Sequence, residues 1–335
     1  MANGKLVFTQ NIATSLQEYC DKCKYENLIF IVDTNTKKYC LPFFKTFSNK
    51  IIEIKAGEQY KNLSTYTFII EKLLTFNVSK DTLIVNLGGG VVSDIGSFAS
   101  ATFRRGIAFV NIPTTLMGMS DAAIGGKNGI DFKFKKNYLG TFVLPQKVFI
   151  STQFLSTLPI KEYESGLAEI IKTGIIANKQ LFKAIEKNEA IDYLIEQCAE
   201  TKNAIVKKDF EDNGIRQLLN YGHTIGHALE SYRLSIGKPI KHGFAVAKGL
   251  LAESKMAYTM GKISHSDYMR ITKVVITLTH QKPLTENEFL RLKEWLKSDK
   301  KNKNSHIVFS LPEGIGKGSI QNEIAENRLH KLIFS

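Results

Sequence analysis

Residues 82–94 read TLIVNLGGGVVSD, and this stretch places the chain among the α/β proteins. The short, unbroken apolar run Thr82–Leu87 predicts a strand that is buried on both faces, and three glycines then lead into a helical segment. Glycines at such a junction let backbone N–H groups approach a phosphate, and a helix N-terminus favours negative charge. The spacing is not G-x-G-x-x-G. Both a phosphate-binding turn and a plain tight strand-to-helix turn therefore stay open.

Similar apolar runs flank this stretch on both sides. Asn27–Val32 (NLIFIV) ends at Asp33, and Ile107–Ile112 (IAFVNI) ends at Pro113. Continuous apolar strands with helical segments between them indicate a parallel sheet that is covered on both faces. From about Leu158 the pattern is that of long helices, with no clear strand until residues 305–311. We therefore predict an α/β domain at residues 1–150 and a mainly helical domain at residues 151–335.

The composition restricts the classes of function. Against 32 acidic residues the chain has 45 basic ones, which gives a formal charge of +13. This excess fits an anionic substrate, or lysines that are merely spread over solvated faces. Nucleic acid is not expected, because the only dense basic stretch is residues 297–303. A membrane span or secretory signal is not expected either, since no long apolar run occurs. Cys20 and Cys23 have no second pair at zinc-site spacing, and a reducing cytoplasm is expected.

Polar residues follow the predicted strands. Asp33-Thr34-Asn35 ends the first of them, where a carboxylate either holds a ribose hydroxyl or caps a helix. Further along, Gly125-Gly126 precedes Lys127, and Lys136-Asn137 adds a second cation and an amide. Exposed backbone beside two cations indicates an anion pocket.

The helical half contains the residues that indicate a metal site. Glu169 and Lys172 lie three apart on a strongly apolar helix, where a buried carboxylate must be paired or ligate a cation. His223 and His227 lie one helical turn apart, and His242 follows. Two histidines on one face, a third nearby and a helical glutamate suit a zinc, cobalt or iron site with an open position. The residues between the pair, Thr-Ile-Gly, provide no general base for a metalloprotease.

Two further cations precede the histidines. Lys202 and Arg216 flank Asp209 and Asp212. Arginine presents a planar fork to a carboxylate or phosphate, and lysine presents a point charge. A solvated helix end is the alternative interpretation.

With these motifs in place, the chain resembles the 3-dehydroquinate synthase family of sugar phosphate cyclases from about Asp33 to Gly316. The blocks that carry the resemblance are, in order, Gly57-Glu58-Gln59-Tyr60-Lys61, Gly88–Asp94, Arg105-Gly106, Pro113–Leu116, Asp121–Lys127, Lys136-Asn137, Phe154–Pro159, Gly166–Lys172, Leu219–Glu230, His242-Gly243 with Ala245-Val246, and Asp299-Lys300-Lys301.

The resemblance implies a Rossmann-like NAD-binding α/β domain joined to a mainly α-helical metal-binding domain. It implies that the ligands of a divalent metal, Zn²⁺ or Co²⁺, are Glu169, His223 and His242, so that His227 contacts substrate instead. The implied NAD⁺ contacts are Asp33, Asn35, Glu58, Lys61, Gly89, Gly90, Val91, Asp94, Thr114, Thr115, Lys136 and Thr157. The implied substrate contacts are Asp121, Lys127, Asn137, Lys172, Lys202, Arg216, Asn220, His227 and either Lys300 or Lys301. Arg105 is implied to reach the site of the neighbouring subunit in a homodimer.

The implied reaction belongs to the shikimate pathway. The family converts 3-deoxy-D-arabino-heptulosonate 7-phosphate, a phosphorylated sugar acid, to 3-dehydroquinate. NAD⁺ oxidises the substrate transiently, phosphate leaves, the hydride returns, and an intramolecular aldol step closes the ring. Four positions depart from the pattern usual in the synthases, namely Ser93, Asn128, Asp212 and Phe244. Phe244 stands where these synthases carry Glu and sister cyclases differ. A cyclitol-forming sister cyclase and a metal-dependent polyol dehydrogenase are therefore the alternatives.

Overall fold

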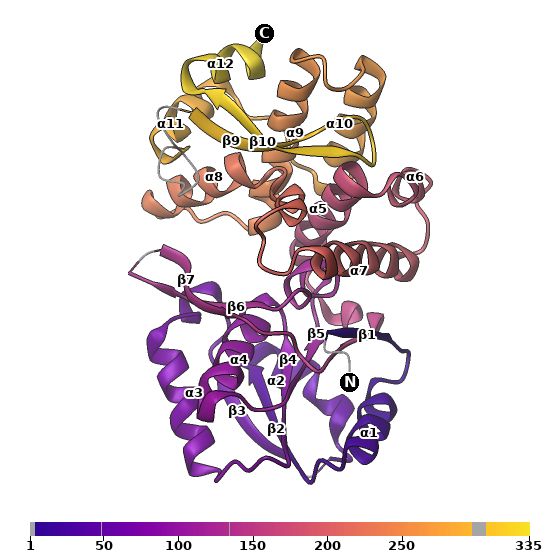
Figure 1. Cartoon of the computed structure of the whole chain (residues 1–335), viewed down its shortest axis with the longest axis vertical. Coiled ribbons are helices and arrows are strands. Elements are labelled where there is room, and N and C mark those ends of the chain that lie inside the picture. The colour runs from indigo at the N-terminus through magenta and orange to yellow at the C-terminus, as the bar shows by residue number, and fades with distance from the viewer. Residues whose placement is uncertain (1–3, 48, 134, 297–305) are drawn as a thin grey trace. The chain divides into compact units, whose positions relative to one another are not determined.

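The computed structural model describes residues 4–47, 49–133, 135–296 and 306–335. It divides into two compact units, Met1–Pro159 and Ile160–Ser335 (Figure 1). The 3-10 helix η5 (Thr152–Thr157) belongs to the first unit, where Phe154 packs edge-on against Phe43 with ring centroids 5.5 Å apart. Among the described helices, none is both long and apolar enough to cross a membrane.

The first unit is built around a parallel sheet of six strands in the order β1-β8-β5-β4-β2-β3. In chain order its elements are β1 (Lys5–Phe8), α1 (Ile12–Cys23), β2 (Asn27–Asp33), α2 (Thr34–Tyr39), η1 (Leu41–Phe44), β3 (Asn49–Ile54), η2 (Glu58–Tyr60), α3 (Leu63–Thr75), β4 (Thr82–Gly88), α4 (Gly90–Thr102), η3 (Phe103–Arg105), β5 (Phe109–Pro113), η4 (Gly118–Ala122), β6 (Lys127–Phe132), β7 (Lys135–Phe142), β8 (Lys147–Ile150) and η5. The predicted parallel sheet is confirmed. The β6 and β7 strands form a separate antiparallel hairpin.

Helices bury both faces of this sheet, which explains the unbroken apolar runs. Every residue of β4 is buried. Ile29 and Ile31 of β2 pack in one cluster with Leu73 of α3 and Ile95 of α4. Phe30 lies between them in sequence and therefore points to the opposite face, where its ring contacts Phe44.

The carboxyl ends of β2, β4 and β5 meet at one edge of the sheet. Gly88 pairs with Pro113, and Val32 of β2 pairs with Leu87 of β4. Asp33, the last residue of β2, caps α2, because its side chain accepts from the backbone N–H groups of Asn35 and Thr36 at 2.9 and 2.8 Å. The helix-capping interpretation of Asp33 is thus confirmed, and a role in ribose binding stays a prediction.

The second unit is mainly helical. Its elements are α5 (Ile160–Ala177), α6 (Lys179–Glu186), α7 (Ile191–Lys208), η6 (Ile215–Asn220), α8 (His223–Ser235), α9 (His242–Thr259), α10 (His265–Thr279), α11 (Glu286–Leu296), β9 (His306–Pro312), β10 (Gly318–Ala325) and α12 (Glu326–Phe334). The sequence predicts the first of the two strands. It misses β10, which pairs antiparallel with β9 and has one fully buried residue of its eight, so it lacks a long apolar run.

Glycines bring the backbones of α8 and α9 into contact. A Cβ atom on Gly249 of α9 would lie 1.9 Å from the carbonyl oxygen of Gly222, which precedes α8. A Cβ atom on Gly226 would lie 3.2 Å from the backbone of Val246. Only hydrogen at position 249 permits this approach, and position 226 leaves little room for a larger residue, so the start of α8 is held directly against α9.

We expect Gly249→Ala to destabilise the second unit by about 3 kcal/mol or more, because the new methyl group meets backbone that cannot move aside. Thermal melting of the purified protein measures this. Lys255→Ala, on a partly exposed position of the same helix, is the matched control and should change the melting temperature little. Equal melting temperatures for Gly249→Ala and the control would show that the two helices are not in close contact.

Candidate functional site

The second unit contains a glutamate side chain that solvent does not reach. Glu169 is 0% exposed on α5, whose residues from Ser165 to Ile176 are all buried. Lys172, one turn further and 1% exposed, forms an ion pair with it. Burial alone raises the pKa of Glu169, but the ammonium of Lys172 and the imidazoles of His223 and His242 hold this pKa well below its ordinary value. The carboxylate is therefore ionised.

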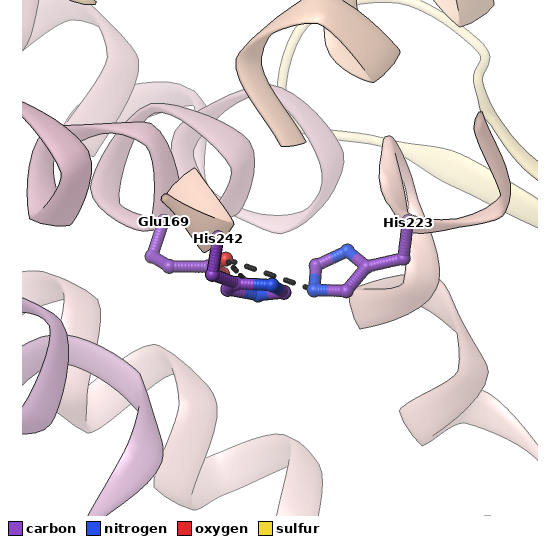
Figure 2. Close-up of side chains that lie close together, drawn as sticks. All are labelled: Glu169, His223 and His242. Carbon is purple, nitrogen blue, oxygen red and sulfur yellow. Dashed lines mark ion pairs between the residues drawn. The ribbon is translucent and has the colours of Figure 1, made fainter. Parts of the chain in front are cut away.

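Two histidines face this carboxylate from the starts of two helices. His223 is the first residue of α8, and His242 is the first residue of α9. Their Nε2 atoms lie 3.6 and 3.5 Å from Oε1 of Glu169. Figure 2 shows both rings converging on the carboxylate. The grouping unites three residues that are up to 73 positions apart in sequence, from 169 to 242.

The outer nitrogen of each ring has its own partner. Nδ1 of His223 lies 3.1 Å from the carbonyl oxygen of Tyr221, which only accepts, so Nδ1 carries the proton. Nδ1 of His242 lies 3.2 Å from the carboxylate of Glu230. Both partners direct Nε2 toward Glu169. Carbonyl and carboxylate partners of this kind orient the histidines of metal sites.

This donor set fits a divalent metal ion. Two ligand atoms, each about 2.1 Å from one tetrahedral ion, lie roughly 3.4 Å apart, close to the distances observed here. Both oxygens of Glu169 are buried, and within the described residues neither accepts a hydrogen bond of ordinary geometry. Their contacts are the ion pair of Oε2 with Lys172 and the two imidazoles that face Oε1. Burial lowers the pKa of His242, but its contacts with Glu169 and Glu230 outweigh this and raise it to about 10. His242 therefore carries a proton at neutral pH, and a bound metal ion is able to replace the positive charge that this proton supplies.

His227 lies beside this group. Its ring centroid is 5.2 Å from that of His223 and 5.9 Å from that of His242, and its side chain is exposed. Across the described part of the chain, two triads have donor atoms close enough for a metal, Glu169-His223-His242 and His227-Glu230-His242. Neither triad contains both His223 and His227, the pair that the helical spacing suggests as metal ligands. The first triad is the more buried, and it includes the carboxylate oxygens that lack hydrogen bonds.

Three cations of the second unit are buried, which explains the sequence pattern around them. Lys172, Lys202 and Arg216 are 1%, 6% and 4% exposed. They lie on α5, α7 and η6, which pack against one another. Arg216 donates from Nη1 to the carbonyl of Phe210 at 2.6 Å. Asn220 ends η6, and its buried Nδ2 donates no hydrogen bond within the described residues. The interpretation of Lys202 and Arg216 as a solvated helix end is wrong, because both are buried.

In the first unit, Lys61 joins several of the predicted nucleotide and substrate residues. Its ammonium, 4% exposed, donates to Asp94 at 3.1 Å and to Oδ1 of Asn137 at 2.7 Å, and it lies 3.3 Å from Glu58. Asp131, which the sequence analysis does not single out, accepts from the backbone N–H of Asn137 at 2.8 Å. The β6–β7 hairpin is therefore tied to the first turns of α4 through one buried lysine.

The other predicted residues of the first unit are spread over several elements. Gly89 caps α4, and Gly90 and Val91 begin it. Thr114 and Thr115 follow β5 and lie against Gly88 and Gly89, since Thr114 donates to the carbonyl of Gly88 at 3.0 Å. Lys127 begins β6, Lys136 lies on β7 within 3.7 Å of Glu58, Asp121 lies on η4, and Thr157 lies on η5. Arg105 is exposed on η3. Lys300 and Lys301 lie outside the described residues.

Comparisons with known proteins agree with this arrangement. The family model described as 3-dehydroquinate synthase N-terminal matches residues 51–165, and the model described as 3-dehydroquinate synthase C-terminal matches residues 166–302. A curated relative from Parabacteroides distasonis, named 3-dehydroquinate synthase, is 36% identical over 98% of this chain and 96% of its own length.

Solved structures share the fold at lower identity. One is a 2-deoxy-scyllo-inosose synthase complexed with carbaglucose-6-phosphate, NAD⁺ and Co²⁺, with a TM-score of 0.86 and 24% identity over 98% of this chain and 95% of that one. The other is a 2-epi-5-epi-valiolone synthase from Streptomyces hygroscopicus with NAD⁺ and Zn²⁺ bound, with a TM-score of 0.86 and 22% identity over 99% and 96%. At these identities the likeness establishes the fold.

We expect His223→Ala to lose bound metal and His227→Ala to retain it, because His223, unlike His227, faces the buried carboxylate of Glu169. Elemental analysis of each purified protein after loading with Zn²⁺ and removal of excess ion measures the metal content. The two substitutions are matched, since they lie one turn apart on α8. Loss of metal from His227→Ala together with retention in His223→Ala would assign the ion to the other triad.

Proposed function

Since the chain belongs to the 3-dehydroquinate synthase family, we propose that it converts 3-deoxy-D-arabino-heptulosonate 7-phosphate to 3-dehydroquinate and phosphate, a step of the shikimate pathway. The cofactors are NAD⁺ and a divalent metal, Zn²⁺ or Co²⁺. The observation that carries this proposal is the buried carboxylate of Glu169 facing Nε2 of two histidines, in a chain whose two halves both match the family.

The metal ligands are Glu169, His223 and His242. When bound, a divalent ion supplies Lewis acidity that makes a substrate hydroxyl group easier to deprotonate. The protein holds the ligand side chains in the orientation that a metal ion needs. Tyr221 and Glu230 hold the two imidazoles with Nε2 inward, and Lys172 keeps the glutamate ionised.

The substrate is an anion, and the second unit offers the cations to bind it. Lys172, Lys202 and Arg216 are buried on neighbouring elements, and the Nδ2 of Asn220 donates no hydrogen bond within the described residues. Buried cations hold carboxylate and phosphate groups in one conformation and neutralise the charge that develops as phosphate leaves. His227, exposed beside the metal triad, is suited to contact substrate. Asp121, Lys127, Asn137 and Lys300 or Lys301 complete the proposed substrate contacts.

The first unit binds the nucleotide. NAD⁺ supplies a reversible hydride acceptor, so that the substrate is oxidised and reduced again within one turnover. Gly89, Gly90 and Val91 expose the N–H groups of the first turn of α4, which suit a pyrophosphate. Lys61 contributes by holding Asp94 and Asn137 in place. The remaining proposed contacts are Asp33, Asn35, Glu58, Thr114, Thr115, Lys136 and Thr157.

A homodimer in the cytoplasm is part of the proposal. Arg105 is exposed and has a backbone φ of +66°, next to Arg104 at +50°. Two consecutive non-glycine residues in this region are strained, and such strain is common where a side chain is presented for function. We propose that Arg105 completes the site of the second subunit. Within the described residues no disulfide joins the cysteines, which are Cys20, Cys23, Cys40 and Cys198, and this fits a reducing compartment.

The activity is tested by phosphate release. The purified protein, given NAD⁺, Zn²⁺ and the heptulosonate phosphate, should release phosphate without accumulating NADH, and His223→Ala should release none. Release only from glucose 6-phosphate or sedoheptulose 7-phosphate would instead identify a cyclitol-forming cyclase, the alternative that Phe244 keeps open. Accumulating NADH would identify a polyol dehydrogenase.

The role of Arg105 is tested by complementation. Arg105→Ala and His223→Ala should each be inactive alone. When the two are co-expressed, each mixed dimer contains one site with both residues intact, so activity should return to roughly a quarter of the wild-type value. Activity that stays at the level of the two separate variants would place Arg105 in the site of its own subunit.

A further inference from the structure

The start of α8 has no side chain of its own to cap it. Gly222 occupies the capping position with φ at +79°, and the first N–H groups of the helix need acceptors from elsewhere. The residues that ordinarily cap helices, such as Ser or Asp, do not fit there. A Cβ atom on Gly222 would lie 2.7 Å from Cδ2 of Leu250 and 3.1 Å from the carbonyl of Val246.

Glu253 of α9 supplies the missing acceptors. Its Oε2 accepts from the N–H of Gly222 at 2.6 Å, and its Oε1 accepts from the N–H of Ile225 at 3.2 Å. The side chain is 0% exposed and forms no ion pair with any residue in the described part of the chain. Burial raises its pKa to about 8, against the opposing effect of the two N–H groups. A carboxyl group is therefore costly to keep at this position.

A single peptide unit connects Glu253 to His223. The N–H of the Tyr221–Gly222 peptide donates to Glu253, and the C=O of the same peptide accepts from Nδ1 of His223. Because a peptide is planar, fixing the direction of its N–H also fixes the direction of its C=O. Hydrogen bonds in such a series also polarise one another. The hydroxyl of Tyr221 is held in turn by Ser254 and by the carbonyl of Leu250, both on α9.

The two histidines of the metal triad thus have similar support by different routes. The carboxylate of Glu230 contacts Nδ1 of His242 directly. Nδ1 of His223 instead contacts the carbonyl of Tyr221, and the N–H of the same peptide donates to the carboxyl group of Glu253.

We propose that Glu253 is a positioning residue for the metal centre, which acts through the Tyr221–Gly222 peptide to set the orientation and metal affinity of His223. The proposal rests on the part of the proposed function in which Glu169, His223 and His242 hold a metal ion. It assigns to a buried acid, which contacts neither substrate nor ion, a measurable effect on metal binding.

The test compares Zn²⁺ affinities of the full-length protein. Glu253→Gln retains one acceptor, and Glu253→Met removes both at similar side-chain length. Each protein is stripped of metal and titrated with Zn²⁺ alone in competition with a chromophoric chelator, at a pH above the Glu253 pKa of about 8, so that both of its oxygens are acceptors in the wild-type protein. We expect affinity to fall about 10-fold in Glu253→Gln and up to about 100-fold in Glu253→Met, as it does when partners behind metal-binding histidines are removed. Glu230→Gln, behind His242, is the reference and should fall within the same range.

A core substitution separates positioning from stability. Ile271→Ala lies on α10, where Ile271 is 0% exposed, and should lower the melting temperature of the metal-free protein without changing Zn²⁺ affinity. Loading with Co²⁺ gives an independent readout, because the visible absorption bands of the ion report its ligand geometry. These bands should shift in Glu253→Gln and stay unchanged in Ile271→Ala.

Wild-type Zn²⁺ affinity and Co²⁺ bands in Glu253→Gln would overturn the proposal and leave Glu253 as a helix cap alone. An equal loss of affinity in Ile271→Ala would also overturn it, because the effect would then follow from stability. If Glu253→Met fails to fold, the nearly isosteric Glu253→Gln decides the question. Failure of the wild-type protein to bind Zn²⁺ would instead contradict the proposed metal centre, and so the two failures are distinguishable.

Discussion

The burial of one carboxylate, that of Glu169, is the constraint on which the second unit depends. A charge without solvent is stable only when other groups surround it, and here Lys172 and two imidazoles do so. The imidazoles come from the first residues of α8 and α9, so both helices must begin beside α5. The loops, caps and glycines around these helix starts follow from that requirement.

Close backbone packing meets this requirement. Gly249 lets α9 touch the residue that precedes α8, and Glu253, one turn later, accepts from the N–H groups at the start of α8. Gly243, next to His242, lies against α5 in the same way, since a Cβ atom there would be 1.8 Å from the carbonyl of Ser165. The donor atoms of the triad are therefore placed by contacts between main chains, which leave little freedom.

Much of the architecture is predictable from local pattern. The runs at Thr82–Leu87 and Asn27–Val32 are apolar because helices cover both faces of the sheet, and they correspond to β4 and β2. Periodicity also finds most helices of the second unit. It misses the half-buried strand β10, which has too few apolar residues in sequence to be recognised.

The residues of the metal site are harder to predict from local sequence pattern. Helical spacing pairs His223 with His227. The resemblance to a family instead implies Glu169, His223 and His242, and the structure brings the donor atoms of these three residues together. Asp131, Glu230 and Glu253 act through partners that only the fold brings near. Glu230 had a sequence signal, because it lies one turn after His227 on the same helix. Glu253 had none, since its two partners are backbone N–H groups about 30 residues away.

The most direct measurement is anomalous X-ray diffraction at the zinc absorption edge from crystals of the protein soaked in Zn²⁺. We expect one strong peak in the second unit, in contact with a carboxylate oxygen of Glu169 and with Nε2 of His223 and of His242. A peak among His227, Glu230 and His242, or no peak beside Glu169, would contradict it.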